Sequence, residues 1–380
     1  MKRFFYCLFL VIAFFALNVH AQNQKAADFY NRGLDLQNAG NLDAALAEYE
    51  KAIAEYPKYA DAYNNRANIK YSRGDIEGAL AEYTRILQID PKYSIGYYNR
   101  GVMYLEKQDF DAAINDFTKT IEAIPQYAMA YNNRGNARKS KKDFEGAMAD
   151  YSKAIELFPK IFEGYYNRGI LKQEQNDIQG SILDFSQAIK IRPDYVEAIA
   201  ARAYSYKLKK DFASAILNYN NAIKLNPNES TYYLYRALCQ MERGNKDSAL
   251  EDFKKASELN PTDPTPYISL AMIYSENKQN DLAIENFSKV IELKPTETFA
   301  YMNRAILFEE KKEFAKASAD YTKTIEIDPA NAQAYARRGL IELKQNRRAE
   351  ARKDLEKAIQ LDPNLKKDYE AFLIEAKKTK

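Results

Sequence analysis

The stretch Tyr131-Asn132-Asn133-Arg134-Gly135-Asn136 decides the fold, because it returns along the chain at a fixed spacing. The sequence reads Tyr97-Tyr98-Asn99-Arg100-Gly101-Val102 34 residues earlier and Tyr165-Tyr166-Asn167-Arg168-Gly169-Ile170 34 residues later. This phase continues ten times, from Phe29 to Tyr335. Prolines mark the same period at Pro57, Pro91, Pro125, Pro159, Pro193, Pro227, Pro261, Pro295, Pro329 and Pro363. Self-similarity at this period indicates a repeat protein, whose units stack into one elongated array.

We number the places within each unit from one. After a lead-in over residues 22–25, the units are 26–59, 60–93, 94–127, 128–161, 162–195, 196–229, 230–263, 264–297, 298–331 and 332–365. An aromatic residue at the fourth place precedes Gly or Ala at the eighth in most units, as in Tyr63 and Ala67. Ala stands at the twentieth place in nine units, with Ser181 in the other, and an aromatic residue follows four residues later in all units but the last, which has Leu355. Small residues let two helices approach closely, and the large residue one turn away covers the same face.

Each unit is therefore predicted to be a helix–turn–helix. Pairs such as Gly40-Asn41, Gly74-Asp75, Lys142-Asp143 and Gly244-Asn245 separate the two halves. Asp or Asn at this point can accept hydrogen bonds from the free amides of the second helix. The proline near the end of each unit stops that helix.

These places resemble the tetratricopeptide repeat family over units 26–365. Ala, the aromatic residue and Pro match the family pattern, while Tyr replaces its Trp and Arg replaces its Leu in nine units. The resemblance implies an all-α fold, a right-handed superhelical solenoid of antiparallel helix pairs whose first helices line a concave groove. Residues 366–380 are predicted to add a capping helix with Tyr369, Phe372, Leu373 and Ala376 on its inner face.

The resemblance also implies that the second, fifth, sixth, ninth, twelfth and thirteenth places face the groove. In units one to five, these places present amides that we take as candidate peptide-binding residues: Asn31, Asn65, Asn68, Asn99, Asn133, Asn136 and Asn167. Asn both donates and accepts hydrogen bonds, so such a row can hold an extended chain by its peptide groups. It resembles the asparagine ladder of the tetratricopeptide arm of a sugar transferase. The alternative is a solvated face on which Asn is merely tolerated.

In units six to ten, the fifth and ninth places become apolar. The candidate contacts there are Leu234, Leu238, Ile268, Met272, Met302 and Ile306, bordered by Glu242, Glu276 and Glu310. An exposed apolar strip marks a partner site, whereas the alternative is burial between helices. Pro264 and Pro266 at the start of unit eight predict a local irregularity.

The arginines at the seventh place are better explained by structure than by anion binding. Each has an acid or amide sixteen residues later, which predicts a pair between the two helices of its unit. The expected pairs are Arg32–Glu48, Arg66–Glu82, Arg100–Asp116, Arg134–Asp150, Arg168–Asp184, Arg202–Asn218, Arg236–Asp252, Arg304–Asp320 and Arg338–Asp354. Unit eight has Leu270 and Asn286 instead. Cys239 is expected to be a buried, inert thiol.

The first 21 residues have the pattern of a secretory signal peptide. Lys2 and Arg3 precede an apolar run from Phe4 to Leu17, and cleavage is expected after Ala21. The run is shorter than the roughly 20 residues of a membrane span. Loss of Lys2 and Arg3 from the 56 basic residues leaves them nearly balanced with the 53 acidic ones. That balance does not favour nucleic-acid binding.

The sequence thus predicts an exported, non-enzymatic scaffold that binds protein or peptide segments in the bacterial cell envelope. The periplasm is the simplest location, and secretion or association with the envelope are the alternatives. The alternative is a self-associating structural component of an envelope assembly. We predict no cofactor, no metal site, no small-molecule substrate and no nucleic-acid partner. Membrane contact is expected only through the N-terminal segment, if that segment is not cleaved.

Overall fold

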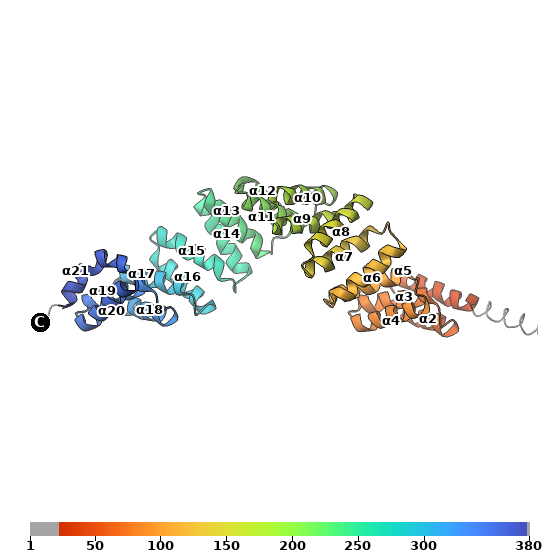
Figure 1. Ribbon diagram of the computed structural model, residues 1–380, viewed down its shortest axis with the longest axis horizontal. Helices are drawn as coiled ribbons and strands as arrows, with labels where there is room; N and C mark the ends of the chain where they lie inside the picture. Colours follow the sequence, from red (N-terminus) through yellow and green to blue (C-terminus); the bar gives the residue numbers. More distant parts are fainter. Residues whose placement is uncertain (1–22, 378–380) are drawn as a thin grey trace, which may run out of the picture. The chain divides into compact units, whose positions relative to one another are not determined.

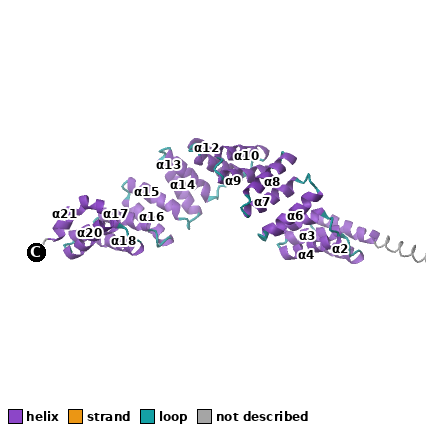
Figure 2. Ribbon diagram, viewed as in Figure 1, coloured by secondary structure: helices purple, strands orange, loops and turns teal. Residues whose placement is uncertain are grey.

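The computed structural model describes residues 23–377, and within them every regular element is a helix (Figures 1 and 2). The first unit has a helix over residues 23–38. The other first helices are α3 (Ala60–Ser72), α5 (Ser94–Glu106), α7 (Ala128–Ser140), α9 (Phe162–Glu174), α11 (Val196–Leu208), α13 (Ser230–Glu242), α15 (Pro264–Glu276), α17 (Thr298–Glu310) and α19 (Ala332–Lys344). The second helices are α2 (Leu42–Glu55), α4 (Ile76–Ile89), α6 (Phe110–Ala123), α8 (Phe144–Leu157), α10 (Ile178–Ile191), α12 (Phe212–Leu225), α14 (Lys246–Leu259), α16 (Asn280–Leu293), α18 (Phe314–Ile327) and α20 (Arg348–Leu361). The predicted all-α solenoid of ten helix pairs is confirmed. The predicted signal segment, residues 1–21, lies outside the described residues.

The chain divides into two compact units, Met1–Pro193 and Asp194–Lys380. Each contains five repeats. Within each, every helix contacts the next helix along the chain, and some first helices also contact each other directly. Examples are α5 with α7 and α7 with α9 in the first compact unit, and α11 with α13 in the second. The first helices therefore form one layer of each compact unit.

The turn between the two helices of a repeat depends on its fifteenth place, which has a positive φ in all ten repeats. Glycine occupies this place only at Gly40, Gly74 and Gly244, and the other seven repeats hold a side chain there, such as Lys142 at φ 64°. The next residue is the N-cap of the second helix. Asp75, Asp109, Asp143, Asp177 and Asp211 each accept a hydrogen bond from a backbone amide of that helix. Asn41 and Asn245 make no such bond, so the predicted cap is wrong at those two positions.

A close approach between the two helices holds each pair together. The side chain at the twenty-fourth place is fully buried, aromatic in nine repeats and Leu355 in the tenth, and where the eighth place is glycine it lies against that glycine. A Cβ atom on Gly135 would lie 2.7 Å from Cε1 of Tyr151, and one on Gly169 would lie 2.7 Å from Cε1 of Phe185. There is no room for a side chain at these two glycines, so the ring packs directly on the backbone of the first helix.

The predicted pairs between the seventh and twenty-third places are confirmed in all nine repeats. Most of the carboxylates are nearly buried, and Asp116 is only 1% exposed. In repeat eight, Leu270 is buried in the apolar core, and Asn286 bonds to the carbonyl oxygen of Leu282 instead.

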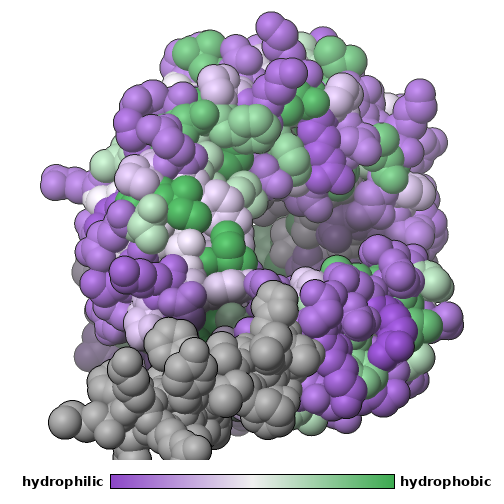
Figure 3. All heavy atoms as spheres, turned by 90° about the vertical axis from the view of Figure 1, so that its right-hand side faces the viewer, coloured by the Kyte–Doolittle hydropathy of each residue, from purple (hydrophilic) through white to green (hydrophobic). Residues whose placement is uncertain are grey.

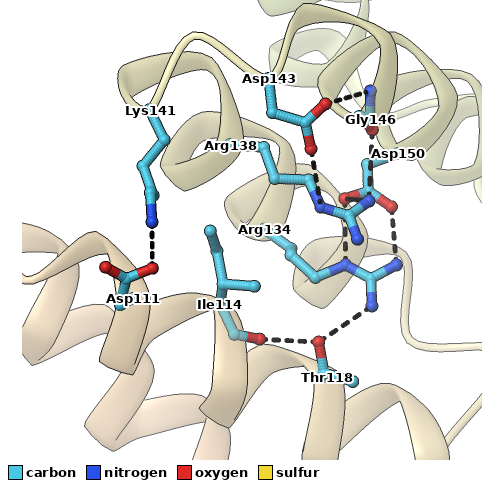
Figure 4. Close-up of polar contacts among 9 residues, drawn as sticks. All are labelled: Asp111, Ile114, Thr118, Arg134, Arg138, Lys141, Asp143, Gly146 and Asp150. Carbon is cyan, nitrogen blue, oxygen red and sulfur yellow. Dashed lines mark hydrogen bonds and ion pairs between the residues drawn. The ribbon is translucent and has the colours of Figure 1, made fainter.

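Several of these arginines also bind the preceding repeat, and Figure 4 shows this contact for Arg134. Arg134 on α7 binds both carboxylate oxygens of Asp150 on α8, at 3.0 and 2.8 Å. Its Nη1 donates to Oγ1 of Thr118 on α6, at 3.1 Å. The same contact joins Arg168 to Ser152, Arg236 to Asn220, Arg304 to Ser288 and Arg338 to Thr322. One arginine thus links the second helices of two successive repeats.

Two expectations about the second compact unit need correction. Pro264 is the first residue of α15, a position that favours proline. α15 is 13 residues long, as α3, α5 and α17 are. The predicted irregularity is therefore absent from this helix. The cap consists of a short 3-10 helix (Pro363–Leu365) and α21 (Lys366–Lys377). Ala376 is buried and Tyr369 and Leu373 pack inward, but Phe372 is 40% exposed rather than on the inner face.

Changing Arg100 to Leu should lower the free energy of unfolding by about 3–5 kcal/mol, because buried Asp116 loses its cation. Adding Asp116→Asn recreates the Leu and Asn of repeat eight and should recover most of that loss. Urea unfolding followed by circular dichroism measures both variants. Equal stability of Arg100→Leu and the double variant would contradict a structural role for the pair.

Candidate peptide-binding face

The predicted asparagine row forms a ladder of hydrogen bonds between neighbouring first helices. Each sixth-place amide nitrogen donates to the fifth-place side chain of the preceding repeat. The four bonds are Asn65 to Tyr30 (3.2 Å), Asn99 to Asn64 (3.0 Å), Asn133 to Tyr98 (3.1 Å) and Asn167 to Asn132 (3.0 Å). We call this set the amide ladder. It joins the five first helices of the first compact unit.

The amide ladder alternates with a period of two repeats. In repeats two and four, Asn64 and Asn132 donate to the amide oxygens of Asn65 and Asn133, so these oxygens are occupied. In repeats one, three and five, the amide oxygens of Asn31, Asn99 and Asn167 accept no hydrogen bond within the described part of the chain. Asn31 is exposed, and Asn99 and Asn167 are partly buried. Every second repeat therefore presents an open acceptor.

The phenols of the ladder supply the complementary group. Tyr30 and Tyr98 accept from the next repeat through oxygen, and their own hydrogens have no acceptor among residues 23–377. Burial raises the pKa of Tyr98 to about 12, so its phenol stays protonated at neutral pH. Repeats one and three thus each present an O–H donor beside an amide acceptor, at Tyr30 with Asn31 and at Tyr98 with Asn99.

Asn68 and Asn136, the ninth-place candidates, serve the core. Their amide oxygens accept from the phenols of Tyr83 and Tyr151, whose rings are buried at the twenty-fourth place. Tyr49 and Tyr321 bond instead to the twelfth-place side chains Gln37 and Glu309. Where the twenty-fourth place is Phe, the ninth is apolar, as in Phe117 with Val102. That co-occurrence is visible in the sequence and could have assigned this role.

Repeat six departs from this rule. Its twenty-fourth place is the buried Tyr219, and its ninth place is Tyr204 rather than an asparagine. The Tyr219 hydroxyl has no hydrogen-bond partner within residues 23–377. The rings of Tyr204 and Tyr235 meet edge to face at 5.4 Å, and Lys207 lies over both. Nearby Cys239 is fully buried, and burial raises the pKa of its thiol to about 11. The thiol therefore stays protonated and unreactive, as predicted.

In the second compact unit, apolar packing replaces the ladder. Leu234 is buried, and Leu238, Ile268 and Met302 are partly buried against core clusters. Ile306 is also partly buried, whereas Met272 is 37% exposed. Phe299, at the second place of repeat nine and 42% exposed, is an apolar residue that our selection of candidates missed. Of the bordering acids, Glu276 pairs with Lys246, and Glu310 accepts from Asn280.

The part of the described surface that Figure 3 shows is mainly polar. Viewed from the right-hand end of Figure 1, hydrophilic side chains dominate, and hydrophobic ones lie between them in small groups (Figure 3). Residues 23–377 hold no cluster of His, Cys, Asp and Glu that could bind a metal ion. Of the described helices, none is both long and apolar enough to cross a bilayer.

Changing Asn136 to Val should cost about 1–3 kcal/mol of stability, because the buried Tyr151 hydroxyl loses its acceptor. Adding Tyr151→Phe gives the pairing of repeat three and should restore stability in urea unfolding. A double variant no more stable than Asn136→Val would show that this bond is not the reason for Asn136.

Tyr219→Phe should leave stability unchanged or raise it by up to about 1 kcal/mol, because it removes a buried hydroxyl that has no partner. Thermal unfolding beside Tyr151→Phe gives a matched comparison, since only the second change removes a hydrogen bond. A larger loss for Tyr219→Phe would mean that its hydroxyl is bonded in solution.

Family models described as tetratricopeptide repeat match residues 30–94, 96–127, 128–161, 162–195, 201–264, 253–285, 300–331 and 332–365. A tetratricopeptide repeat protein from Parabacteroides merdae is 21% identical over 66% of this chain and 99% of its own, with a TM-score of 0.50. Pseudomonas aeruginosa pilF is 16% identical over 57% and 97% of the two chains, also with a TM-score of 0.50. YrrB, described as a TPR protein with an unusual peptide-binding site, is 23% identical over 48% and 95%, with a TM-score of 0.44. No curated protein sequence matches. Since the family models together cover most of the chain, it belongs to the tetratricopeptide repeat family.

Proposed function

We propose that this chain is a non-enzymatic scaffold that binds an extended protein segment along the amide ladder, in the bacterial cell envelope. Tetratricopeptide repeats commonly bind protein or peptide partners, so family membership supports a protein–protein interaction scaffold. The ladder supports the finer proposal, because it gives one face of the first compact unit a regular set of hydrogen-bonding groups.

The observation that carries the proposal is the pairing of an open donor and an open acceptor in repeats one and three. A peptide group also has one donor and one acceptor, so Tyr98 and Asn99 can bind a backbone with little regard for its side chains. Each such bond contributes about 0.5–1.5 kcal/mol. The ladder already holds these side chains in place, which lowers the entropy lost on binding.

The second compact unit offers a different chemistry. Exposed Met272 and Phe299 supply apolar contacts on its first helices α15 and α17. Leu234 and Ile268 instead support these helices from the core. We therefore propose a backbone-binding face in repeats one to five and an apolar contact face in repeats eight and nine.

A crosslinked capture from intact cells tests the ladder with a matched pair of variants. One carries Asn31→Ala, Asn99→Ala and Asn167→Ala, which removes the open acceptors and two ladder bonds. The control carries Asn65→Ala and Asn133→Ala, which removes the other two ladder bonds and only occupied acceptors. We expect the first variant to capture at least tenfold less partner than wild type, and the control to capture nearly as much as wild type.

Circular dichroism must show that both variants are folded. Equal capture by both variants would contradict the backbone-binding face. Capture of nothing but further copies of this chain would instead favour a self-associating component.

The location rests on the N-terminal segment. If residues 1–21 direct export, the mature protein should begin at Gln22 and appear in the periplasmic fraction. N-terminal sequencing of protein from fractionated cells measures both. Full-length protein retained in the cytoplasm would contradict this part of the proposal.

A further inference from the structure

The buried phenol of Tyr219 lacks an acceptor that its equivalents in other repeats have. Five repeats have tyrosine at the twenty-fourth place. In four of them the phenol donates to a side-chain oxygen of the first helix, on Gln37, Asn68, Asn136 or Glu309. Tyr219 is 1% exposed, and burial raises the pKa of its phenol, which therefore stays a donor at neutral pH. A buried donor without an acceptor costs free energy, so repeat six has one unfilled hydrogen-bonding position.

The hydroxyl at the twenty-fourth place faces two places on the first helices. In repeat one, Tyr49 donates to the twelfth-place side chain at 2.7 Å, and Asn65, at the sixth place of the next repeat, donates to Tyr49 at 3.4 Å. The same two places in repeats six and seven are Lys207 and Tyr235. The rings of Tyr219 and Tyr235 are stacked with their centroids 6.1 Å apart, which agrees with this position. The Tyr219 hydroxyl therefore points toward α11 and α13.

The groups around this hydroxyl are donors as well. They are the phenols of Tyr204 and Tyr235 and the ammonium of Lys207, which lies 5.3 and 5.5 Å from the centroids of the two rings. Within residues 23–377, Lys207 makes no ion pair, and neither phenol makes a hydrogen bond. Glu242 on α13 is exposed and makes no ion pair with Lys207 in this part of the chain. Three phenols and one cation thus gather here with no carboxylate bonded to them.

Repeat nine shows which acceptor completes such an arrangement. Glu309 stands at the twelfth place, as Lys207 does in repeat six, and its carboxylate accepts from Tyr321 at 2.8 Å. It also accepts from Arg337, at the sixth place of the next repeat, at 3.3 Å. Lys344 lies 3.7 Å from the other carboxylate oxygen. One carboxylate therefore satisfies a buried phenol and two basic side chains at once.

We propose that repeats six and seven form a carboxylate site, in which a carboxylate of a partner protein supplies the acceptor that Glu309 supplies in repeat nine. Its oxygens accept hydrogen bonds from the phenols of Tyr219 and Tyr235. Lys207 turns aside to admit the carboxylate, since its stem is flexible, and its ammonium pairs with the same group. Hydrogen bonds to a charged acceptor are roughly twice as strong as neutral ones, so the site prefers a carboxylate to an amide.

The carboxylate has two possible sources in a protein. Tetratricopeptide repeats commonly bind protein or peptide partners, so it is either an acidic side chain or the end of a chain. The site lies in the second compact unit and the amide ladder in the first. Either proposal can therefore fail alone.

Fluorine NMR of the full chain tests the site directly. A fluorotyrosine with its fluorine beside the hydroxyl replaces Tyr219, and the same replacement of Tyr151 is the matched control, because that hydroxyl already bonds to Asn136. N-acetylglutamic acid α-amide is the probe for an acidic side chain, and N-acetylglycine is the probe for a chain end. N-acetylglutamine amide is the neutral control of the same shape.

We expect a saturable shift of the resonance at position 219 with at least one carboxylate probe, and none at position 151. Half-saturation should need at least tenfold less carboxylate than neutral control. The probe that binds identifies the source of the carboxylate. No saturable shift with either carboxylate would overturn the proposal, and so would equal binding of the neutral control or an equal shift at position 151.

Two variants of Lys207 test the same site by thermal unfolding, without fluorotyrosine. Lys207→Gln supplies the acceptor that Gln37 supplies in repeat one, so it should raise the Tm and remove the further rise that a carboxylate probe gives wild type. Lys207→Met removes the cation and adds no acceptor, so it should leave the Tm unraised and weaken carboxylate binding at least tenfold. Undiminished stabilisation of both variants by the carboxylate probes would overturn the proposal.

Discussion

The rest of the structure depends on one close contact, in which the buried side chain at the twenty-fourth place, aromatic in nine of the ten repeats, packs against the first helix of its repeat. The rings of Tyr151 and Phe185 leave no room for a side chain at Gly135 and Gly169. This contact sets the separation at which a seventh-place arginine reaches the carboxylate sixteen residues later. The same arginine reaches back to the preceding second helix, which fixes how repeats stack. Only with that stacking do side chains 35 residues apart meet in the amide ladder.

Most of the fold could be predicted from the sequence, because each repeat has the same residue types at the same places. The period, the helix pairs and the nine pairs from Arg32–Glu48 to Arg338–Asp354 all follow from spacing. Two details were harder because they depend on geometry that type and spacing leave open. Asn41 and Asn245 have the right residue for a helix cap but do not make the bond. Phe372 has the right spacing for the core, but a full second helix would be needed to cover it.

The sequence predicted which side chains share one face of the first helices, but not which partners they bond to. Spacing placed the asparagines on one layer, but it could not show that they bond to one another, because the fifth place of one repeat meets the sixth of the next only after stacking. The ninth-place amides of Asn68 and Asn136 accept hydrogen bonds from buried phenols, because a hydroxyl without a partner in the core costs free energy. What remains for a ligand is the alternation of open groups at Asn31, Asn99 and Asn167. In the second compact unit, apolar side chains at the fifth place support the helices without such groups.

The central claim is that a partner lies along the ladder face of the first compact unit. Site-specific photocrosslinking measures this directly in living cells. A photoreactive residue replaces Asn99 on the ladder in one variant and Lys119, exposed on second helix α6, in the other. The account predicts a covalent adduct with a partner protein from position 99 and none with that protein from position 119. An adduct from position 119 alone would contradict it and place the partner on the second helices.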